Sequence, residues 1–553
     1  MMAEIGKLET FLTIGRDALA RIGQLVFFLR SRTTSLISQN GVVAEPFLLQ
    51  HQHAFHALAW FKVYELAILE IISFTETMHL NDTLSEPIEL FSRIGVGELL
   101  CQFFNGISMS QSEFARLSDF GLTPDDVAAW RTPGIDMLLS TGNTTDNRAR
   151  LIAHLTDDHF AGDCWDLDEE IAVIRRQVRQ FVDEKISPRA QKWHLDNRYI
   201  PIELIKELGA LGIFGVSIPE HFGGVGLGKV AMSVVTEELS RGYLGVGSLG
   251  TRAEIAAELI LHGGSEKQKA RLLPRIATGE LLTTAAFTEP EAGSDLASVR
   301  TRALRTGDSY RIYGNKTWIT HAARADLIVL LARTDASQMG SRGLSIFLAE
   351  KPRGDERNPF PVAGLFGNEI EVPGYRGMKE FDLSFDGFEV SADSLLGETE
   401  SGAFKQLLST FESARIQTAA RAVGVTQAAL ELALTYAKTR TQFKKRLIEF
   451  PRISDKIVLM ATEAYIARLI TIAAARRKDA GQRCDLEAGA AKLYAARAAW
   501  AAADNALQIH GGHGYALASQ ASRLLCDARV LGIFEGTAEI QAQVIARRLL
   551  GLD

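Results

Sequence analysis

The sequence predicts an α+β protein that is mostly α-helical, with one small β domain between helical regions. Apolar residues recur at three- and four-residue steps before about residue 283 and after about residue 395, which is the pattern of amphipathic helices. Only the region between them alternates with period two, as half-buried strands do. The chain has 553 residues, enough for roughly three to four domains, so we expect several compact parts.

Residues 1–160 are predicted to form a helical N-terminal extension. Ala57, Phe61 and Tyr64 fall on one side of a helix. The window 55–73 is strongly apolar, but it also contains Lys and Glu side chains. We therefore expect a buried helix there and not a membrane span.

Residues 161–283 are predicted to form a second helical domain. Ile171, Val178 and Val182 recur at helical spacing, and Pro188 follows as a signal for the end of that helix. The periodicity then continues to about residue 283.

Residues 284–395 are predicted to form a small β domain. Phe381, Leu383 and Phe385 alternate with polar residues, as on a strand with one buried face. The dipeptide Gly314-Asn315 is a turn signal, which predicts a hairpin at this point.

Residues 396–553 are predicted to form a C-terminal four-helix bundle. The long helical patterns cover residues 402–440, 452–480, 485–509 and 537–550. Helices of this length pack most simply as an antiparallel bundle.

The composition excludes several classes of protein. The net charge is −7 and no long basic run occurs, which argues against nucleic acid or an anionic membrane as the main partner. The four cysteines are far apart and form no CxxC pair, so we expect no disulfide framework, no zinc site and a reducing, cytoplasmic location. The first residues lack the features of a signal peptide. His51, His53 and His56 have no carboxylate or cysteine to complete a site, so we expect no metal.

One glycine motif suggests a nicotinamide site but lacks the right context. Residues 245–250 match GxGxxG, which binds a dinucleotide only when a strand precedes it and a helix follows it. Here the preceding segment, 233–241, has a helical pattern. We therefore expect a loop between helices and no nicotinamide.

Four separated segments carry the chemistry. They are TEPEAGSD at 288–295, WIT at 318–320, QIHGGHGY at 508–515 and FEGT at 534–537. In this order, and within a helix–sheet–helix architecture, they resemble the acyl-CoA dehydrogenase family over residues from about 165 to 553.

The resemblance implies an enzyme with FAD bound between the β domain and the bundle. Trp318 offers an aromatic face, Thr288 and Thr320 offer hydroxyl groups to the flavin ring, and Ser294 matches a residue that contacts CoA. Arg440 matches an arginine that meets the FAD pyrophosphate, for which a guanidinium is suited. The remaining residues implied to bind the cofactor are Phe287, Gln508, Gly511, Gly512 and Thr537.

Two residues depart from the family pattern near the expected adenosine end of FAD. Lys444 stands where the family usually has glycine, and Pro451 stands where it often has glutamine. The family's glycine-rich turn contacts the cofactor of a neighbouring subunit, so the resemblance also implies a homodimer or homotetramer.

Glu535 is the catalytic base that the resemblance implies. The family removes a proton from the carbon next to a thioester and a hydride from the following carbon, and a carboxylate must accept that proton. The backbone N–H of Glu535 would also hold the thioester oxygen, Gly536 would allow close approach to the substrate, and Thr537 would cap the next helix. An ordinary surface glutamate before a helix is the alternative, but flanking apolar residues favour a desolvated site.

Some family members carry the base on the first bundle helix. That position falls here on Ala414, which cannot accept a proton. Glu412 and Arg415 match residues that border the substrate site, although an ordinary ion pair on a helix face explains them equally well.

The N-terminal extension indicates which acyl group the substrate carries. Segments 53–60, 94–99 and 106–111 resemble the extension of methylsuccinyl-CoA dehydrogenases within the family. This implies oxidation of (2S)-methylsuccinyl-CoA to mesaconyl-CoA in the ethylmalonyl-CoA pathway, with electrons passing to electron-transferring flavoprotein. The substrate carboxylate would need a cation, because an unpaired buried charge is costly. Arg252 is the candidate, with pairing to Glu254 or another neighbour as the alternative.

Other acyl groups and one non-enzymatic class remain open. Isobutyryl-, 2-methylbutyryl- or glutaryl-CoA would suit the same chemistry. A DNA-binding flavoprotein of the same fold would require a basic surface, and the C-terminal region 452–553 has scattered arginines rather than a run.

Overall fold

The computed structural model describes residues 8–39, 42–157, 167–338 and 340–552. The boundary predicted at residue 160 lies outside these residues. The described chain divides into two compact units, and α15 (Ala403–Thr439) contributes to both. Unit 1 comprises residues 1–169, 418–477 and 481–553, and unit 2 comprises residues 170–417 and 478–480.

Unit 1 is helical and contains the N-terminal extension together with most of the bundle. The extension's helices are α2 (Leu8–Ile37), α3 (Glu45–Gln50), α4 (Gln52–Leu80), α5 (Glu86–Asn105), α6 (Pro124–Trp130), α7 (Pro133–Thr141) and α8 (Thr145–Thr156). The bundle helices are α16 (Pro451–Asp479), α17 (Asp485–His510), α18 (Gly512–Tyr515), α19 (Gln520–Val530) and α20 (Ala538–Leu550). The predicted long helices are confirmed, while α19 was not expected from the sequence.

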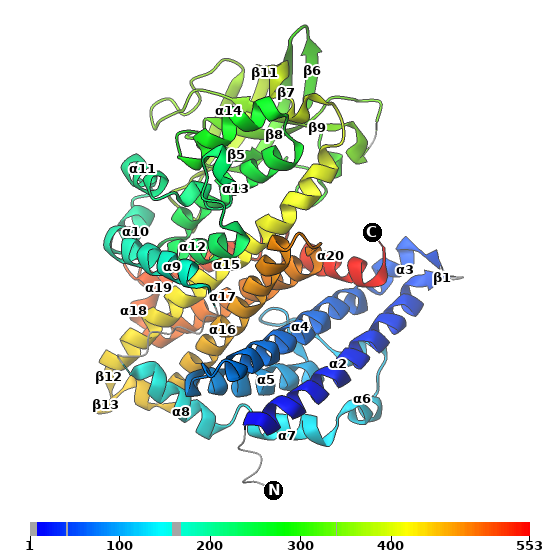
Figure 1. The fold of residues 1–553 in the computed structure, drawn as a ribbon, viewed down its shortest axis with the longest axis vertical. Coiled ribbons are helices and arrows are strands. Elements are labelled where there is room, and N and C mark those ends of the chain that lie inside the picture. Colours follow the sequence, from blue (N-terminus) through cyan, green and yellow to red (C-terminus); the bar gives the residue numbers. More distant parts are fainter. Residues whose placement is uncertain (1–7, 40–41, 158–166, 339, 553) are drawn as a thin grey trace. The chain divides into compact units, whose positions relative to one another are not determined.

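The extension and the bundle share one core. Helix α4 packs against α2, α17 and α20 (Figure 1). The rings of Tyr64 on α4 and Tyr494 on α17 are 6.1 Å apart, and the hydroxyls of Ser92 on α5 and Tyr465 on α16 are 3.1 Å apart. Because these contacts join the two ends of the sequence, the extension is an integral part of unit 1.

Helix α16 is the one described helix that is long and apolar enough to cross a membrane by length and composition. Of its most apolar window, 78% is buried inside the protein. The core helix of a globular protein meets the same criteria, and burial explains the composition of α16.

Unit 2 combines helices with a seven-stranded sheet. Its main helices are α9 (Glu169–Phe181), α10 (Ser187–Leu195), α11 (Ile202–Ala210), α12 (Gly228–Gly242), α13 (Leu244–Gly263) and α14 (Glu266–Ala277). The strands are β5 (Thr283–Ala286), β6 (Arg302–Thr306), β7 (Ser309–Thr320), β8 (Leu327–Arg333), β9 (Leu344–Glu350), β10 (Leu365–Ile370) and β11 (Glu380–Ser391). The sheet order is β10-β11-β7-β6-β8-β5, and β9 pairs with β8.

Two local predictions from glycine were wrong. Strand β7 runs without interruption through Gly314-Asn315, where a turn was expected. A Cβ at Gly314 would meet the Oγ1 of Thr301 at 2.7 Å, so this glycine permits close contact between neighbouring segments. The GxGxxG segment, expected to be a loop, lies inside α13, and a Cβ at Gly247 would meet the Oγ of Ser240 at 2.0 Å. Gly247 and Gly250 let α13 approach α12, and a helix precedes the segment, as predicted.

Truncation of Phe61 should destabilise the extension strongly. This side chain is fully buried, with its ring 4.8 Å from that of Phe103 and 5.8 Å from that of Phe120. Phe61→Ala should lower the free energy of unfolding of unit 1 by about 3–5 kcal/mol, measured by urea denaturation. Phe27→Ala, at a position that is 65% exposed, is the matched control and should change it by less than about 0.5 kcal/mol. Equal effects of the two substitutions would contradict the shared core.

Candidate active site

A β-bulge in unit 2 exposes Trp318. Phe381 pairs with Ile319 and Leu383 pairs with Lys316, so two residues of β7 lie opposite Asp382 alone. Bulges turn side chains away from their regular direction. Trp318 has φ 58° and is 56% exposed, although large aromatic side chains are usually covered. The indole therefore offers an open aromatic face.

A buried ion pair fixes the loop that carries Phe287, Thr288 and Ser294. The Nζ of Lys316 donates to the Oε1 of Glu289 and to the backbone carbonyl of Phe287, both at 2.9 Å. The backbone N–H of Thr317 donates to the carbonyl of Thr288 at 3.0 Å. The sequence motifs at 288–295 and 318–320 are thereby brought together, and Ser294 is exposed.

The electrostatics of this pair follow from burial. Burial lowers the pKa of Lys316 to about 8. Burial alone would raise the pKa of Glu289, but the charge of Lys316 and the N–H groups of Arg300 and Thr301 hold it below its usual range. The carboxylate thus stays ionised and keeps its hydrogen bonds to the loop.

Thr320 is buried, and its hydroxyl faces a carboxyl group. Its Oγ1 donates to the Oε2 of Glu380 at 3.0 Å. Burial raises the pKa of Glu380 to about 7, although Thr320 and Arg252 act in the opposite direction. Burial, followed by the charge of Arg324, lowers the pKa of the adjacent His321 to about 3. Glu380 and His321 were not identified from the sequence.

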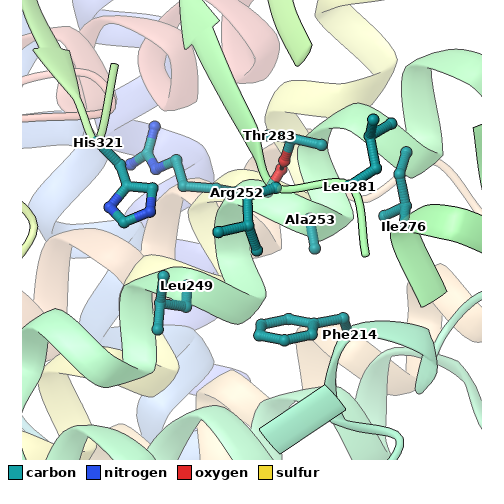
Figure 2. Close-up of a pocket in the computed structure, with 9 residues that line it drawn as sticks. Phe214, Leu249, Arg252, Ala253, Ile276, Leu281, Thr283 and His321 are labelled. Carbon is teal, nitrogen blue, oxygen red and sulfur yellow. Dashed lines mark hydrogen bonds between the residues drawn. The ribbon is translucent and has the colours of Figure 1, made fainter. Parts of the chain in front are cut away.

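Arg252 on α13 lies in this buried polar region. Figure 2 shows its side chain extending toward the ring of His321. Both residues line a cavity of about 10 Å³, which is about the space that one water molecule requires. Glu254, the alternative partner considered for Arg252, instead pairs with Lys229 at 2.8 Å.

Glu535 lies in unit 1, immediately before α20. Its Oε1 is 2.8 Å from the Nη2 of Arg421, and its Oε2 accepts a hydrogen bond from the Oγ1 of Thr418 at 2.7 Å. The side chain of Glu535 is 12% exposed and that of Arg421 is fully buried. The carboxylate is therefore mostly withdrawn from water, as expected, but it is also paired with a cation that was not predicted from the sequence.

The backbone around Glu535 is held by buried donors. The Nζ of Lys492 donates to the carbonyl of Gly536 at 2.6 Å, and the Nε2 of Gln541 donates to the carbonyl of Glu535 at 3.2 Å. Gly536 has φ 88°, and a Cβ there would meet the Nε2 of Gln541 at 2.2 Å, so only glycine fits. The Oγ1 of Thr537 accepts from the N–H of Ile540, which confirms the predicted helix cap.

The alternative base position and its neighbours lie on α15. Ala414 is buried and Glu412 pairs with Lys478 at 2.8 Å. Arg415 is 9% exposed. Glu412 therefore has a cation partner other than the arginine three residues along the helix.

The residues expected near the FAD pyrophosphate and at the glycine turn lie at helix ends in unit 1. Tyr436, one turn before Arg440, stacks on His510 with ring centroids 4.1 Å apart. The end of α15 and the turn containing Gln508, Gly511 and Gly512 are thus neighbours. Gly511 has φ 59° and ψ −139°, a conformation essentially restricted to glycine.

The hairpin after Arg440 shows how one departure from the family pattern is accommodated. It is formed by β12 (Thr441–Gln442) and β13 (Lys445–Arg446). Lys444 at its tip has φ 63°, a value that favours glycine, and Phe443 beside it is 88% exposed. A lysine therefore occupies a glycine-type conformation here.

Within the described ranges, no group of three His, Cys, Asp or Glu side chains is arranged to hold a metal ion.

Comparisons with known proteins agree with this geometry. The acyl-CoA dehydrogenase N-terminal, middle and C-terminal domain models match residues 168–280, 284–387 and 402–550. The chain is 53% identical over 547 residues to (2S)-methylsuccinyl-CoA dehydrogenase of Cereibacter sphaeroides, covering 98% of this chain and 99% of the relative.

Solved structures give the same result for the fold. A glutaryl-CoA dehydrogenase in complex with glutaryl-CoA is 33% identical with a TM-score of 0.66, covering 70% of this chain and 97% of that one. The butyryl-CoA dehydrogenase of Megasphaera elsdenii is 31% identical with a TM-score of 0.66, covering 70% and 99%. The chain belongs to the acyl-CoA dehydrogenase family, whose members are FAD-dependent oxidoreductases. The predicted family, enzyme class and mostly helical α+β fold are confirmed.

Replacing His321 by Asn should make the protein less sensitive to mild acid. His321 has a pKa of about 3 in the folded chain, against about 6.5 when unfolded. As the pH falls below 6.5, the unfolded chain binds a proton that the folded chain does not, which costs about 2 kcal/mol between pH 7 and pH 5. Urea denaturation at these two pH values should show a smaller loss of stability in His321→Asn.

Glu380→Gln provides a control of opposite sign. Because the pKa of Glu380 is raised to about 7, the folded chain gains a proton before the unfolded chain as the pH falls, which adds stability. Removing this group should therefore enlarge the loss between pH 7 and pH 5. Identical pH dependence in both variants and the wild type would refute these assignments.

Proposed function

We propose that this chain oxidises (2S)-methylsuccinyl-CoA to mesaconyl-CoA, with Glu535 as the catalytic base. The observation that supports the proposal is the fraction of the chain that each similar protein covers. The relative named for this activity matches 98% of the chain and so includes the extension, whereas the glutaryl- and butyryl-CoA dehydrogenase structures cover 70%.

The mechanism follows from the position of one carboxylate. Bound FAD supplies the acceptor for the hydride from the β-carbon. Glu535 removes the proton from the α-carbon, and a general base of this kind contributes roughly 10²–10⁴-fold to the rate. The backbone N–H of Glu535 donates to the thioester oxygen, which stabilises the negative charge that develops there. Lys492 and Gln541 support this role because they fix the backbone on which the carboxylate is mounted.

The residues of unit 2 supply the surface for the flavin ring. The exposed face of Trp318 fits a planar aromatic group, and the loop fixed by Lys316 joins its backbone at Thr288 to Thr317, the residue before Trp318. Ser294 is exposed, as a contact for CoA requires. The other residues proposed to bind the cofactor are Phe287, Thr320, Arg440, Gln508, Gly511, Gly512 and Thr537.

The residues proposed for the acyl part of the substrate are Arg252, Glu412, Arg415 and Gly536. Gly536 is proposed to let the chain approach the substrate closely, and its lack of a side chain already allows the contact with Gln541. Arg252 is proposed as the cation that binds the free carboxylate of the substrate. Its charge also acts on the buried carboxyl group of Glu380, whose pKa it lowers.

The cellular role is proposed on the same basis. Electrons pass from the flavin to electron-transferring flavoprotein, in the ethylmalonyl-CoA pathway, in the cytoplasm. The chain acts as a homodimer or homotetramer, and neither nucleic acid nor membrane is a partner. The exposed glycine turn at the end of α17 supports contact with a second subunit. The division into residues 1–160, 161–283, 284–395 and 396–553 is retained as a proposal for the domains.

Replacing Glu535 by Gln should abolish most turnover while preserving the flavin. We expect kcat with methylsuccinyl-CoA to fall by about 10²–10⁴-fold, because the amide cannot accept the α-proton. Glu539→Gln, one turn into α20, is the matched control and should keep the activity. The visible flavin spectrum of each variant reports cofactor binding. Full turnover by Glu535→Gln would sink the assignment of the base.

A panel of thioesters separates the proposed substrate from its alternatives. Anaerobic bleaching of the flavin should be fastest with methylsuccinyl-CoA and slower with glutaryl-, isobutyryl-, 2-methylbutyryl- and butyryl-CoA. Faster bleaching by glutaryl-CoA would favour the second candidate, a glutaryl-CoA dehydrogenase, which the fold similarity supports. Salt-sensitive retention on DNA, combined with no bleaching by any thioester, would favour the DNA-binding class.

Arg252→Leu tests the cation proposed for the substrate carboxylate. We expect the activity with methylsuccinyl-CoA to fall by about 10-fold or more relative to that with 2-methylbutyryl-CoA, since only the former presents a charge. The measurement is kcat/KM for both thioesters. Equal losses would remove Arg252 from this role.

A further inference from the structure

A buried carboxyl group lies next to Thr320 in unit 2. The Oγ1 of Thr320 donates to the Oε2 of Glu380 at 3.0 Å, and the two residues stand opposite each other on β7 and β11. Thr320 is 6% exposed and Glu380 is 5% exposed. Among the residues that the structure describes, the other oxygen of Glu380, Oε1, is buried and has no hydrogen-bond partner. The carboxyl group therefore has one oxygen engaged and one oxygen open.

This environment holds the carboxyl group close to the balance between its two protonation states. A carboxylate withdrawn from water is stable only when its oxygens accept hydrogen bonds, and Glu380 has an acceptor left over. Burial accordingly raises the pKa of Glu380 to about 7, although the hydrogen bond from Thr320 and the charge of Arg252 act in the opposite direction. A modest change in nearby charge is therefore enough to bind or release a proton.

Three other charged or titratable side chains lie around Glu380. His321 follows β7, and burial lowers its pKa to about 3, so its ring is neutral near pH 8. Arg252 on α13 carries a guanidinium, which stays charged in proteins. Lys379, the residue before Glu380, pairs with Glu369 at 2.7 Å. We therefore expect Glu380 to be the member of this group that changes its charge close to neutral pH.

The position of Glu380 next to Thr320 brings it close to charge that appears during the reaction. Thr320 is one of the residues proposed to bind FAD. If its hydroxyl contacts the flavin ring, Glu380 lies two hydrogen-bond lengths, about 6 Å, from that ring. Hydride transfer brings two electrons and one proton, so it adds one negative charge to the flavin. At about 6 Å and an effective dielectric constant of about 20, this charge raises the proton affinity of a carboxylate by about 100-fold.

We propose that Glu380 takes up one proton when the flavin is reduced, so that the total charge of the buried site stays constant. This inference rests on the proposed function, because it requires FAD beside Thr320. The Cβ–H bond of the thioester breaks, its hydrogen and electron pair pass to FAD, and a proton from solvent bonds to the Oε1 of Glu380. The Oε2 keeps the hydrogen bond from Thr320. The flavin gains one negative charge and Glu380 loses one.

Proton uptake by Glu380 makes the flavin a better electron acceptor. Because the coupling between proton and electrons is reciprocal, a 100-fold gain in proton affinity raises the reduction potential by up to about 60 mV. Glu380 acts through Thr320 and through its own charge, and it does not touch the substrate. It is therefore a positioning residue, and the quantity that reports its role is the flavin potential.

The first test uses the wild-type holoenzyme at about pH 8, without any thioester. Photoreduction of the flavin, followed by infrared difference spectroscopy, should produce the C=O stretching band of a protonated carboxyl group, and this band should shift in D₂O. A carboxyl group with a pKa of about 7 is mostly ionised at this pH before reduction, so the band reports proton uptake. Absence of the band in the reduced protein would overturn the inference.

The second test assigns the proton by comparing two Glu→Gln substitutions on β11. Glu389 is exposed and lies nine residues along the same strand, so Glu389→Gln removes an equal charge far from Thr320. The carboxyl band should be lost in Glu380→Gln and kept in Glu389→Gln. A band that survives in Glu380→Gln would mean that another group takes up the proton.

Redox titration of the same proteins measures the coupling itself. Between about pH 7.5 and pH 8.5, the flavin potential should fall more steeply with pH in the wild type and Glu389→Gln than in Glu380→Gln. The difference should be about 30 mV per pH unit, since a tenfold change in proton concentration changes a two-electron potential by this amount for each proton. Equal slopes in all three proteins, with intact flavin spectra, would refute the role of Glu380.

The two levels of proposal fail in different ways, because photoreduction requires no thioester. If methylsuccinyl-CoA does not bleach the flavin but photoreduction yields the carboxyl band, the proposed substrate is wrong and proton uptake stands. If methylsuccinyl-CoA bleaches the flavin but photoreduction yields no band, the substrate assignment stands and only proton uptake is rejected.

Discussion

Two buried ion pairs in this protein each hold a segment that we propose to be part of the active site. Lys316 and Glu289 are both buried in unit 2, and their contact fixes the loop next to Trp318. Arg421 and Glu535 form the corresponding pair in unit 1. An ion withdrawn from water without a partner would cost several kcal/mol, so each pair restricts its loop to a conformation that keeps the contact. Preorganisation of the site thus follows from the cost of burying charge.

The sequence predicted the helices far better than it predicted these pairs. Apolar spacing alone gave the helices of the bundle, because periodicity is a local property of the chain. Lys316 and Glu289 are 27 residues apart, and Thr418 and Glu535 are 117 residues apart. Such contacts depend on the tertiary fold. The signal for Arg421 was nevertheless present, since a charged residue interrupts the apolar run Ala419 to Val423 on a long helix.

The errors had physical causes that can be named. A turn at Gly314-Asn315 and a loop at GxGxxG were predicted because glycine allows unusual backbone conformations. In the structure these glycines mainly allow close packing. The alternating pattern of β7 also changes phase at the bulge, so that Lys316 and Ile319 are both buried despite their odd spacing. A strict period of two could not have assigned both residues to the inner face.

The shared core of unit 1 has a consequence for how the chain is made. Ser92 and Tyr465, which meet across α5 and α16, are separated by 373 residues. At synthesis rates of about 5–20 residues per second, the ribosome needs roughly 20–75 seconds to proceed from Ser92 to Tyr465. During this time the apolar face of α5 cannot pack against α16. During translation the extension therefore depends on its own helices, or on a chaperone, for cover until the last fifth of the protein emerges.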